Sequence, residues 1–217
     1  MPPLLRGLAL AAFATLAATW LAAAPTAAAE PVRIVALGDS LTAGYGLPPG
    51  SGFPTKLEAA LAARGIAATV VDAGVSGDTT SGALARLDWS VGTDADAVIV
   101  ELGGNDALRA VDPALTRENL DAILARLAAR GVPVLVAGMR APPNLGEAYA
   151  GAFDPIFQEI AERHGALLYP FFLDGVAADP ALNQGDGIHP TAEGVAVIVE
   201  RILPSVEALV ARAAERS

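Results

Sequence analysis

The 217-residue sequence contains no cysteine, only two histidines and a single lysine. Without cysteine there is neither a disulfide nor a thiol for lipid attachment, so burial of the core must stabilise the fold. The two histidines, His164 and His189, are well separated. A zinc site would be hard to assemble from them, because such sites gather several His or Cys ligands. We therefore expect no metal and no cofactor.

Basic residues are scarce as well. The sequence has 14 lysines and arginines against 24 acidic residues, and Arg6 is the only charged residue before Glu30. Removing Arg6 from the count leaves 13 basic against 24 acidic side chains from Glu30 onward, a formal charge of −11. Such a surface repels nucleic acid and anionic lipid headgroups. We expect no nucleic-acid partner, at most a transient contact with membrane lipid, and a monomer.

The amino-terminal segment has the pattern of a secretory leader. Arg6 precedes an apolar run rich in alanine, Pro25 interrupts that run, and three alanines end it. This pattern predicts a signal peptide over residues 1–29, cleaved after Ala29, and a periplasmic or secreted protein. An uncleaved anchor is the alternative, although Pro25 comes before the run reaches the ~20 apolar residues that a spanning helix needs. Residues 30–217 suit one domain.

Five apolar segments alternate with helical patterns along this domain. Most are continuously apolar, as expected for strands of a parallel sheet that is covered on both faces. The alternation predicts a three-layer α/β fold, and five strands favour the flavodoxin-like order 2-1-3-4-5. The predicted strands are Val32–Leu37, Ala67–Asp72, Ala97–Leu102, Val132–Ala137 and Ala166–Tyr169.

The intervening segments carry helix start and stop signals. Thr116 is predicted to be the N-cap of a helix that ends at Gly131. Phe153, Phe157 and Ile160 predict the apolar face of a single helix that follows.

Polar turns marked by glycine follow the predicted strands. In the predicted strand order, the carboxyl ends of strands 1 and 3 lie side by side and open a crevice, which is where such sheets bind ligands. We therefore expect a functional site at this edge of the sheet. The residues that the turns bring there are, in chain order, Ser40, Gly77, Asn105 and His189.

Ser40 is a candidate nucleophile. A serine hydroxyl needs a base within hydrogen-bond reach and a group that orients the base. His189 fits this need, because Asp186 three residues earlier can accept from its Nδ1–H and leave Nε2 for the serine. The alternative for this turn is an Asx turn that caps a helix starting near Thr191. His164 precedes a glycine at a predicted helix end, where a structural role explains it.

Acyl transfer also requires hydrogen-bond donors for the oxyanion of the tetrahedral intermediate. Three candidates lie at the same edge of the sheet: the backbone N–H groups of Ser40 and Gly77 and the side-chain amide of Asn105. Taken singly, Gly77 is explained equally well as a turn glycine and Asn105 as a left-handed turn residue. Their joint placement with a serine and a histidine favours catalysis.

These residues lie in four blocks that resemble the GDSL, or SGNH, hydrolase family. The blocks read GDSLT (38–42), GVSGDT (74–79), GGND (103–106) and DGIHP (186–190), in family order across the domain. The resemblance implies that Ser40 is nucleophile and oxyanion donor, that Gly77 and Asn105 are further donors, that His189 is the base and that Asp186 is its partner.

The resemblance extends to a bacterial periplasmic branch of thioesterases, lysophospholipases and arylesterases. It is carried by LGDSLTAGYGLP, GVSGDTTSGALARLDW, ELGGNDALR and APPNLGEAYAGAF. It implies a serine esterase that hydrolyses small carboxylic esters and thioesters through an acyl-serine intermediate. By the same implication an acyl groove lies beside the serine. Exposed apolar residues at a helix start are the alternative explanation. The implied contacts are Leu108, Arg109, Pro143, Asn144, Leu145 and Tyr149.

Other functions are weighed against this one. The G-x-S-x-G elbow of an α/β-hydrolase is absent, and Ser76 is a rival nucleophile that we expect only to support its turn. Asp39 superficially fits a non-catalytic flavodoxin-like receiver, but the only lysine, Lys56, is not after the last strand, where receivers use one. Removal of acetyl groups from carbohydrates shares the same triad and stays open as an alternative.

Overall fold

The computed structural model describes residues 30–216, so the predicted leader over residues 1–29 lies outside the described residues. A sheet of five parallel strands in the order β2-β1-β3-β4-β5 forms the centre of the molecule, which confirms the predicted order. Each strand agrees with its predicted range to within two residues at either end. The strands are β1 (Val32–Gly38), β2 (Ala68–Gly74), β3 (Ala97–Glu101), β4 (Val134–Ala137) and β5 (Leu167–Tyr169).

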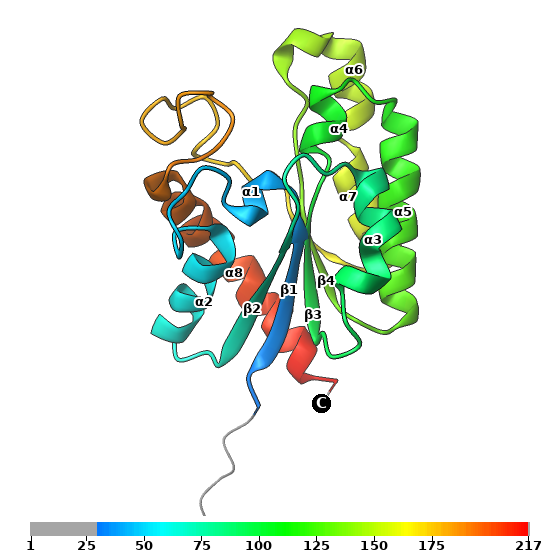
Figure 1. Cartoon of the computed structure of the whole chain (residues 1–217). Coiled ribbons are helices and arrows are strands. Elements are labelled where there is room, and N and C mark those ends of the chain that lie inside the picture. Colours follow the sequence, from blue (N-terminus) through cyan, green and yellow to red (C-terminus); the bar gives the residue numbers. More distant parts are fainter. Residues whose placement is uncertain (1–29, 217) are drawn as a thin grey trace, which may run out of the picture.

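Helices cover both faces of the sheet and complete the predicted three layers (Figure 1). The pair α2 and α8 packs on one face, and α3, α5 and α7 pack on the other. The helices are α1 (Ser40–Ala43), α2 (Phe53–Ala63), α3 (Thr80–Ser90), α4 (Gly104–Leu108), α5 (Pro113–Ala129), the 3₁₀ turn η1 (Pro143–Leu145), α6 (Gly146–Phe153), α7 (Ile156–His164) and α8 (Ala192–Ala214).

Burial of the strands explains their continuous apolar sequence. Every residue of β3 and β4 is buried, because each of these strands has a neighbour on both sides and helices above and below. The edge strand β2 has no buried residue by the same measure. Among residues 30–216, no helix combines the length and the apolar character that crossing a membrane requires.

The predicted N-cap at Thr116 is wrong. Helix α5 begins four residues earlier, with Asp112 as N-cap and Pro113 in the first turn. The Asp112 Oδ1 atom accepts a hydrogen bond from the Ala114 N–H at 2.9 Å. An aspartate followed by proline is a strong signal for the start of a helix. N–H groups in the first turn have no intrahelical acceptor, so the lack of an N–H in proline costs nothing there. Thr116 is instead buried, and its hydroxyl donates to Asp106.

The single helix predicted for Phe153, Phe157 and Ile160 is wrong too. Helix α6 ends at Phe153 and α7 begins at Ile156, with Pro155 between them. Proline lacks the N–H that would continue the helix, and its ring clashes with the preceding turn. The three apolar residues are nevertheless all buried in the same core.

The strands nearest the predicted crevice end at one level. Gly38 at the end of β1 is in register with Gly74 of β2 and with Glu101 of β3. The segments that follow these strands therefore start at the same edge of the sheet, beside one another. This edge is the switch point of a doubly wound sheet, where ligands bind in folds of this kind.

Close packing at this edge requires glycine at position 74. A Cβ atom there would lie 2.5 Å from the backbone nitrogen of Ala43 and 2.8 Å from the carbonyl oxygen of Asp39. Both are backbone atoms of the segment that includes α1, so they cannot move aside without moving the helix. The absence of a side chain at Gly74 therefore sets how closely α1 approaches β2.

Replacing Gly74 with alanine should lower the free energy of unfolding by about 1–3 kcal/mol, the usual cost of overpacking. Urea unfolding followed by circular dichroism measures this loss. Gly151→Ala is the matched control, because a Cβ atom there meets nothing within 4 Å on helix α6. The control should be neutral or stabilising by about 1 kcal/mol. Equal stability of the two variants would contradict the close approach of α1.

Candidate active site

Ser40 is the first residue of the short helix α1, directly after β1. Asp39 is the N-cap, and its Oδ1 atom accepts a hydrogen bond from the Leu41 N–H at 2.9 Å. The Ser40 side chain therefore leaves the end of a buried strand at a sharp turn, and the residue is 9% exposed. Such a position is rigid and still open to a ligand on one side.

His189 meets Ser40 from the other end of the chain. The His189 Nε2 atom lies 2.9 Å from the Ser40 Oγ atom, although the two residues are 149 positions apart. On the other side of the ring, Nδ1 lies 2.6 Å from the Asp186 Oδ2 atom. The three side chains thus form a continuous hydrogen-bonded row of hydroxyl, imidazole and carboxylate.

Asp186 also organises the turn that carries the histidine. Its Oδ1 atom accepts hydrogen bonds from the backbone N–H groups of Ile188 and His189, at 2.9 and 3.0 Å. The sequence left the side-chain pair and an Asx turn that caps the next helix as alternatives. The structure contains the pair and an Asx turn, but the N-cap of α8 is Thr191, whose hydroxyl accepts from the Gly194 N–H at 3.2 Å. The hydrogen bond from the His189 side chain, followed by the two backbone bonds, lowers the pKa of Asp186 to about 2. The residue is therefore an anion at neutral pH.

The second histidine and the rival serine lie elsewhere. His164 ends helix α7 before Gly165, which has the left-handed conformation of a helix C-cap, and its Nε2 atom lies 2.8 Å from Asp121 Oδ1. Ser76 is exposed in the turn after β2. The imidazole that contacts a serine is that of His189, and the serine is Ser40.

The Gly77 turn is held in place by two arginines. Gly77 has a φ of +82°, a value that favours glycine, and its carbonyl accepts a hydrogen bond from Arg109 at 2.7 Å. Arg86 donates to the Asp78 carboxylate and to the carbonyl oxygens of Gly38 and Ala73. These bonds join the ends of β1 and β2 to the turn, so the backbone at Gly77 has a defined position relative to Ser40.

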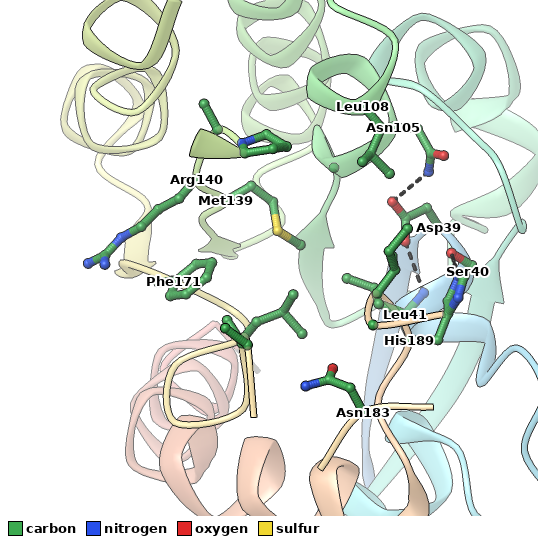
Figure 2. A pocket seen from close by; sticks show the side chains of 18 of the residues that line it. Asp39, Ser40, Leu41, Asn105, Leu108, Met139, Arg140, Phe171, Asn183 and His189 are labelled. Carbon is green, nitrogen blue, oxygen red and sulfur yellow. Dashed lines mark hydrogen bonds between the residues drawn. The ribbon is translucent and has the colours of Figure 1, made fainter. Parts of the chain in front are cut away.

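Asn105 lies on helix α4, which follows β3. Its Nδ2 atom donates to the Asp39 Oδ2 atom at 2.9 Å (Figure 2). A side-chain amide nitrogen carries two hydrogens, so this bond uses one and leaves the other for a ligand. The next residue, Asp106, is buried and accepts hydrogen bonds from the Thr80 backbone and hydroxyl, at 2.9 and 2.6 Å. That network fixes α4 against α3.

An apolar cavity of about 370 Å³ adjoins Ser40. Figure 2 shows Ser40 and His189 on one side of it, and Arg140 and Phe171 on the opposite side. The Arg140 guanidinium lies over the Phe171 ring, 4.8 Å from its centroid. The apolar residues that line the cavity are Leu41, Leu108, Met139, Ala141, Pro142, Pro143, Phe171, Leu173, Ala177, Ala178 and Ile188.

Two of the six residues expected to contact substrate, Leu108 and Pro143, line this cavity. Arg109 is engaged with the Gly77 carbonyl, and the Tyr149 hydroxyl donates to the Val111 carbonyl at 2.7 Å. Asn144 and Leu145, in the turn η1, are not part of the cavity wall.

Most of the cavity wall was not anticipated from the sequence. Met139 and Arg140 lie two and three residues after the end of β4, and Phe171 and Leu173 lie shortly after β5. In the sequence, only their position just after predicted strands indicates that these apolar or charged residues line a site. A continuous apolar stretch such as FFL gives no indication of whether it belongs to the core or to a cavity.

Comparison with known proteins decides the family. Residues 36–197 match the GDSL-like Lipase/Acylhydrolase family. Esterase TesA of Pseudomonas aeruginosa is 38% identical over 184 residues, which cover 84% of this chain and 90% of that protein. The chain belongs to the GDSL-like lipase/acylhydrolase family.

Two further relatives support this membership. The thioesterase 1/protease 1/lysophospholipase L1 of Escherichia coli K12 is 35% identical, over 84% of this chain and 87% of that protein. The crystal structure of AlinE4, an SGNH-hydrolase family esterase, superposes with a TM-score of 0.71 at 48% identity, covering 84% of this chain and 98% of that chain. The chain is accordingly an ester hydrolase with the α/β fold of these enzymes.

Two buried carboxyl groups lie beneath the serine of this acylhydrolase. Glu101 is fully buried and accepts from the Thr42 hydroxyl at 2.7 Å, and Asp39 is 2% exposed. Burial raises the pKa of Glu101 well above its usual range, with the nearby Asp39 charge adding to the rise. Burial also raises the pKa of Asp39 to about 6, against the hydrogen bonds from Leu41 and Asn105, which lower it.

Within residues 30–216, no cluster of three or more His, Cys, Asp or Glu side chains has the arrangement needed to hold a metal ion. The groups that surround Ser40 are hydrogen-bond donors, an imidazole ring, carboxyl groups and apolar side chains.

Replacing Asp39 with asparagine should remove a pH-dependent part of the stability. The pKa of Asp39 rises from 3.8 to about 6 on folding, so its carboxyl stabilises the fold fully below pH 3.8 and loses that contribution as the pH rises through 6. Asparagine does not titrate. The unfolding free energy of Asp39→Asn relative to the wild type should therefore rise by about 3 kcal/mol between acidic and neutral pH.

Urea unfolding of both proteins at several pH values between about 3 and 7 measures this difference. The titration of groups distant from Asp39 cancels in it. Glu101 also contributes, because its pKa depends on the Asp39 charge. Asparagine keeps an oxygen that can cap the Leu41 N–H, so helix α1 should persist in the variant. A difference that stays constant with pH would contradict the raised pKa of Asp39.

Proposed function

We propose that this chain is a serine esterase that hydrolyses carboxylic esters and thioesters through an acyl-Ser40 intermediate. The observation that carries the proposal is the row from Asp186 through His189 to Ser40, with Nδ1 and Nε2 each bonded to one neighbour. In a row of this kind the imidazole is held with Nε2 free to take the serine proton.

Acylation begins when Ser40 Oγ attacks the carbonyl carbon of the ester. His189 Nε2 takes the hydroxyl proton as the new C–O bond forms, and the Asp186 anion stabilises the imidazolium that results. The imidazolium then gives its proton to the leaving alcohol or thiol as the bond to that group breaks. The low pKa of Asp186 supports this role, because the residue stays ionised across the neutral range.

The oxyanion is proposed to bind the Ser40 and Gly77 backbone N–H groups and the Asn105 amide. Donors that are already in place cost no reorganisation when charge develops on the carbonyl oxygen. The Arg109 and Arg86 contacts support the position of Gly77, and Asp39 holds the Asn105 amide by one of its two hydrogens.

Deacylation repeats the same steps with water. His189 takes a proton from water as it attacks the acyl-Ser40 carbonyl, and then returns a proton to Ser40 Oγ as the acid leaves. The same base and the same donors therefore serve both halves of the reaction.

The lining of the cavity favours fatty-acyl or aryl groups as substrates. Leu41, Leu108 and Phe171 offer apolar contacts beside the nucleophile, and burial of an apolar chain contributes about 0.8 kcal/mol per methylene. The esterase and thioesterase/lysophospholipase names of the relatives are consistent with such substrates. An acetylated sugar would leave its hydroxyls against this apolar wall without partners, which disfavours carbohydrate deacetylation.

The location we propose is the periplasm or the exterior of the cell. The support is the sequence pattern of residues 1–29, with cleavage after Ala29 and one hydrolase domain over residues 30–217. In that location lysophospholipids and other esters outside the inner membrane are the available substrates. We propose that the enzyme acts there as a monomer.

Ser40→Ala should reduce kcat by at least about 10³-fold without changing the fold, because the residue is small and lies at a turn. The measurement is hydrolysis of acetyl to palmitoyl esters of p-nitrophenol, a lysophosphatidylcholine, an acyl-CoA and an acetylated sugar. Thermal unfolding is the control for folding. Retained activity in the variant would indicate Ser76 as the nucleophile. If the wild type hydrolysed only the acetylated sugar, the substrate class would be acetylated carbohydrates instead.

Asn105→Ala should lower kcat by about 10²–10³-fold while KM changes little, since the donor acts mainly on the transition state. Steady-state kinetics with one p-nitrophenyl ester separates the two constants. A large rise in KM with unchanged kcat would instead make Asn105 a substrate-binding residue.

A further inference from the structure

The turn that carries His189 has little attachment of its own to the nucleophile. The bonds from Asp186 to His189 and Ile188 lie within the turn, and residues 185–188 are exposed. These bonds orient the ring relative to the turn but do not fix the turn relative to Ser40. Some other contact must do so, because a misplacement of about 1 Å in a catalytic group can cost 10²-fold in rate.

Tyr45 provides one such contact. It lies two residues after the end of helix α1, and its ring centroid is 4.6 Å from that of the His189 imidazole, with the planes inclined by 39°. The Tyr45 N–H donates to the Ser40 carbonyl at 3.1 Å, so its position is tied to the nucleophile. The residue is 54% exposed, so packing in the core does not account for the position of its ring.

Gln184 provides the second contact. Its Nε2 atom donates to the Tyr45 carbonyl at 2.8 Å and to the Pro190 carbonyl at 3.0 Å. Its backbone N–H donates to the His189 carbonyl at 2.7 Å. One side chain thus ties the loop after the serine to both ends of the histidine turn, across 139 residues of sequence.

The fit around this side chain is tight. A Cβ atom on Gly46 would lie 2.3 Å from the Gln184 Oε1 atom, and Gly46 has a φ of +74°. Only glycine at position 46 accommodates both the backbone conformation and the amide of Gln184. The segment Tyr45-Gly46 is therefore shaped to receive the glutamine.

We infer that Tyr45 and Gln184 are positioning residues that together clamp the His189 imidazole over Ser40. The inference rests on the proposed function, in which His189 is the base. Gln184 fixes the histidine turn to the loop that follows the serine, and the Tyr45 ring limits rotation and sideways movement of the imidazole. The same ring lies within the range at which an aromatic face stabilises a cation, so it also favours the imidazolium formed during each proton transfer.

Two substitutions test the clamp. Gln184→Glu keeps the size of the side chain but removes the N–H donors that reach Tyr45 and Pro190, and Tyr45→Ala removes the ring. Each should lower kcat for p-nitrophenyl butyrate by about 10- to 100-fold, with KM changed less than about 3-fold. Tyr45→Phe retains the ring and should restore activity to within about twofold of the wild type.

The rate of Ser40 phosphonylation by a small fluorophosphonate is the second readout. It depends on activation of the serine by His189 and makes little use of the acyl cavity, so it should fall by the same factor as kcat. Gln158→Glu, on the exposed face of α7, is the matched control for the added charge, and Trp89→Ala, 85% exposed on α3, is the control for loss of an aromatic ring. Both controls should keep wild-type rates.

The outcomes separate the two hypotheses. If the wild type neither hydrolyses esters nor is phosphonylated at Ser40, the proposed function fails. If the wild type reacts and Tyr45→Ala and Gln184→Glu both keep its rates within about twofold, the clamp is overturned. If the two variants lose activity only in proportion to a loss of folded protein, seen by thermal unfolding, the residues are structural and the inference is also overturned.

Discussion

The parallel pairing of β1 between β2 and β3 is the constraint on which the rest of the site depends. Gly38 is level with Gly74 on one side and with Glu101 on the other, so three strands deliver their loops to one place. Ser40, Gly77 and Asn105 come from these three loops. The sheet therefore sets where these three loops begin, and the contacts of Arg86, Arg109 and Asp39 then place Gly77 and Asn105. His189 and its partner Asp186 come from outside this unit, so the turn that carries them requires its own attachment to the sheet edge.

The site also places carboxyl groups in two opposite environments. Asp186 is exposed and surrounded by donors, which lowers its pKa, whereas burial raises the pKa of Asp39 and Glu101. The first is suited to balance the charge on an imidazolium. Burial disfavours the ionised form of both Asp39 and Glu101 beneath the serine. Their observed use is structural, as hydrogen-bond acceptors for α1, Thr42 and Asn105. Residues of one chemical type therefore differ in role because of their burial and their hydrogen-bond partners.

The strands and the residues at their carboxyl edge were predictable because they follow from local patterns, and the strand order followed from the topology of doubly wound five-stranded sheets. A continuous apolar run predicts a buried parallel strand, and a polar glycine-marked turn after it points to the carboxyl edge. The errors came where two local signals competed. Helix α5 starts after Asp112, at Pro113, rather than after Thr116. The apolar spacing of Phe153 and Phe157 predicted one helix, but Pro155 separates two.

The cavity wall was harder to predict for a physical reason. Its residues come from the segments after β4 and β5, and whether Met139 or Phe171 faces the core or a void depends on how those segments cross the sheet edge. The same applies to Tyr45 and Gln184, whose contact joins loops that share no sequence pattern. Chemistry in this fold is thus encoded in short blocks after strands, while substrate choice and the placement of the base depend on tertiary contacts between loops. Sequence blocks therefore identify the reaction more securely than the substrate, and here the cavity wall gives the better indication of substrate.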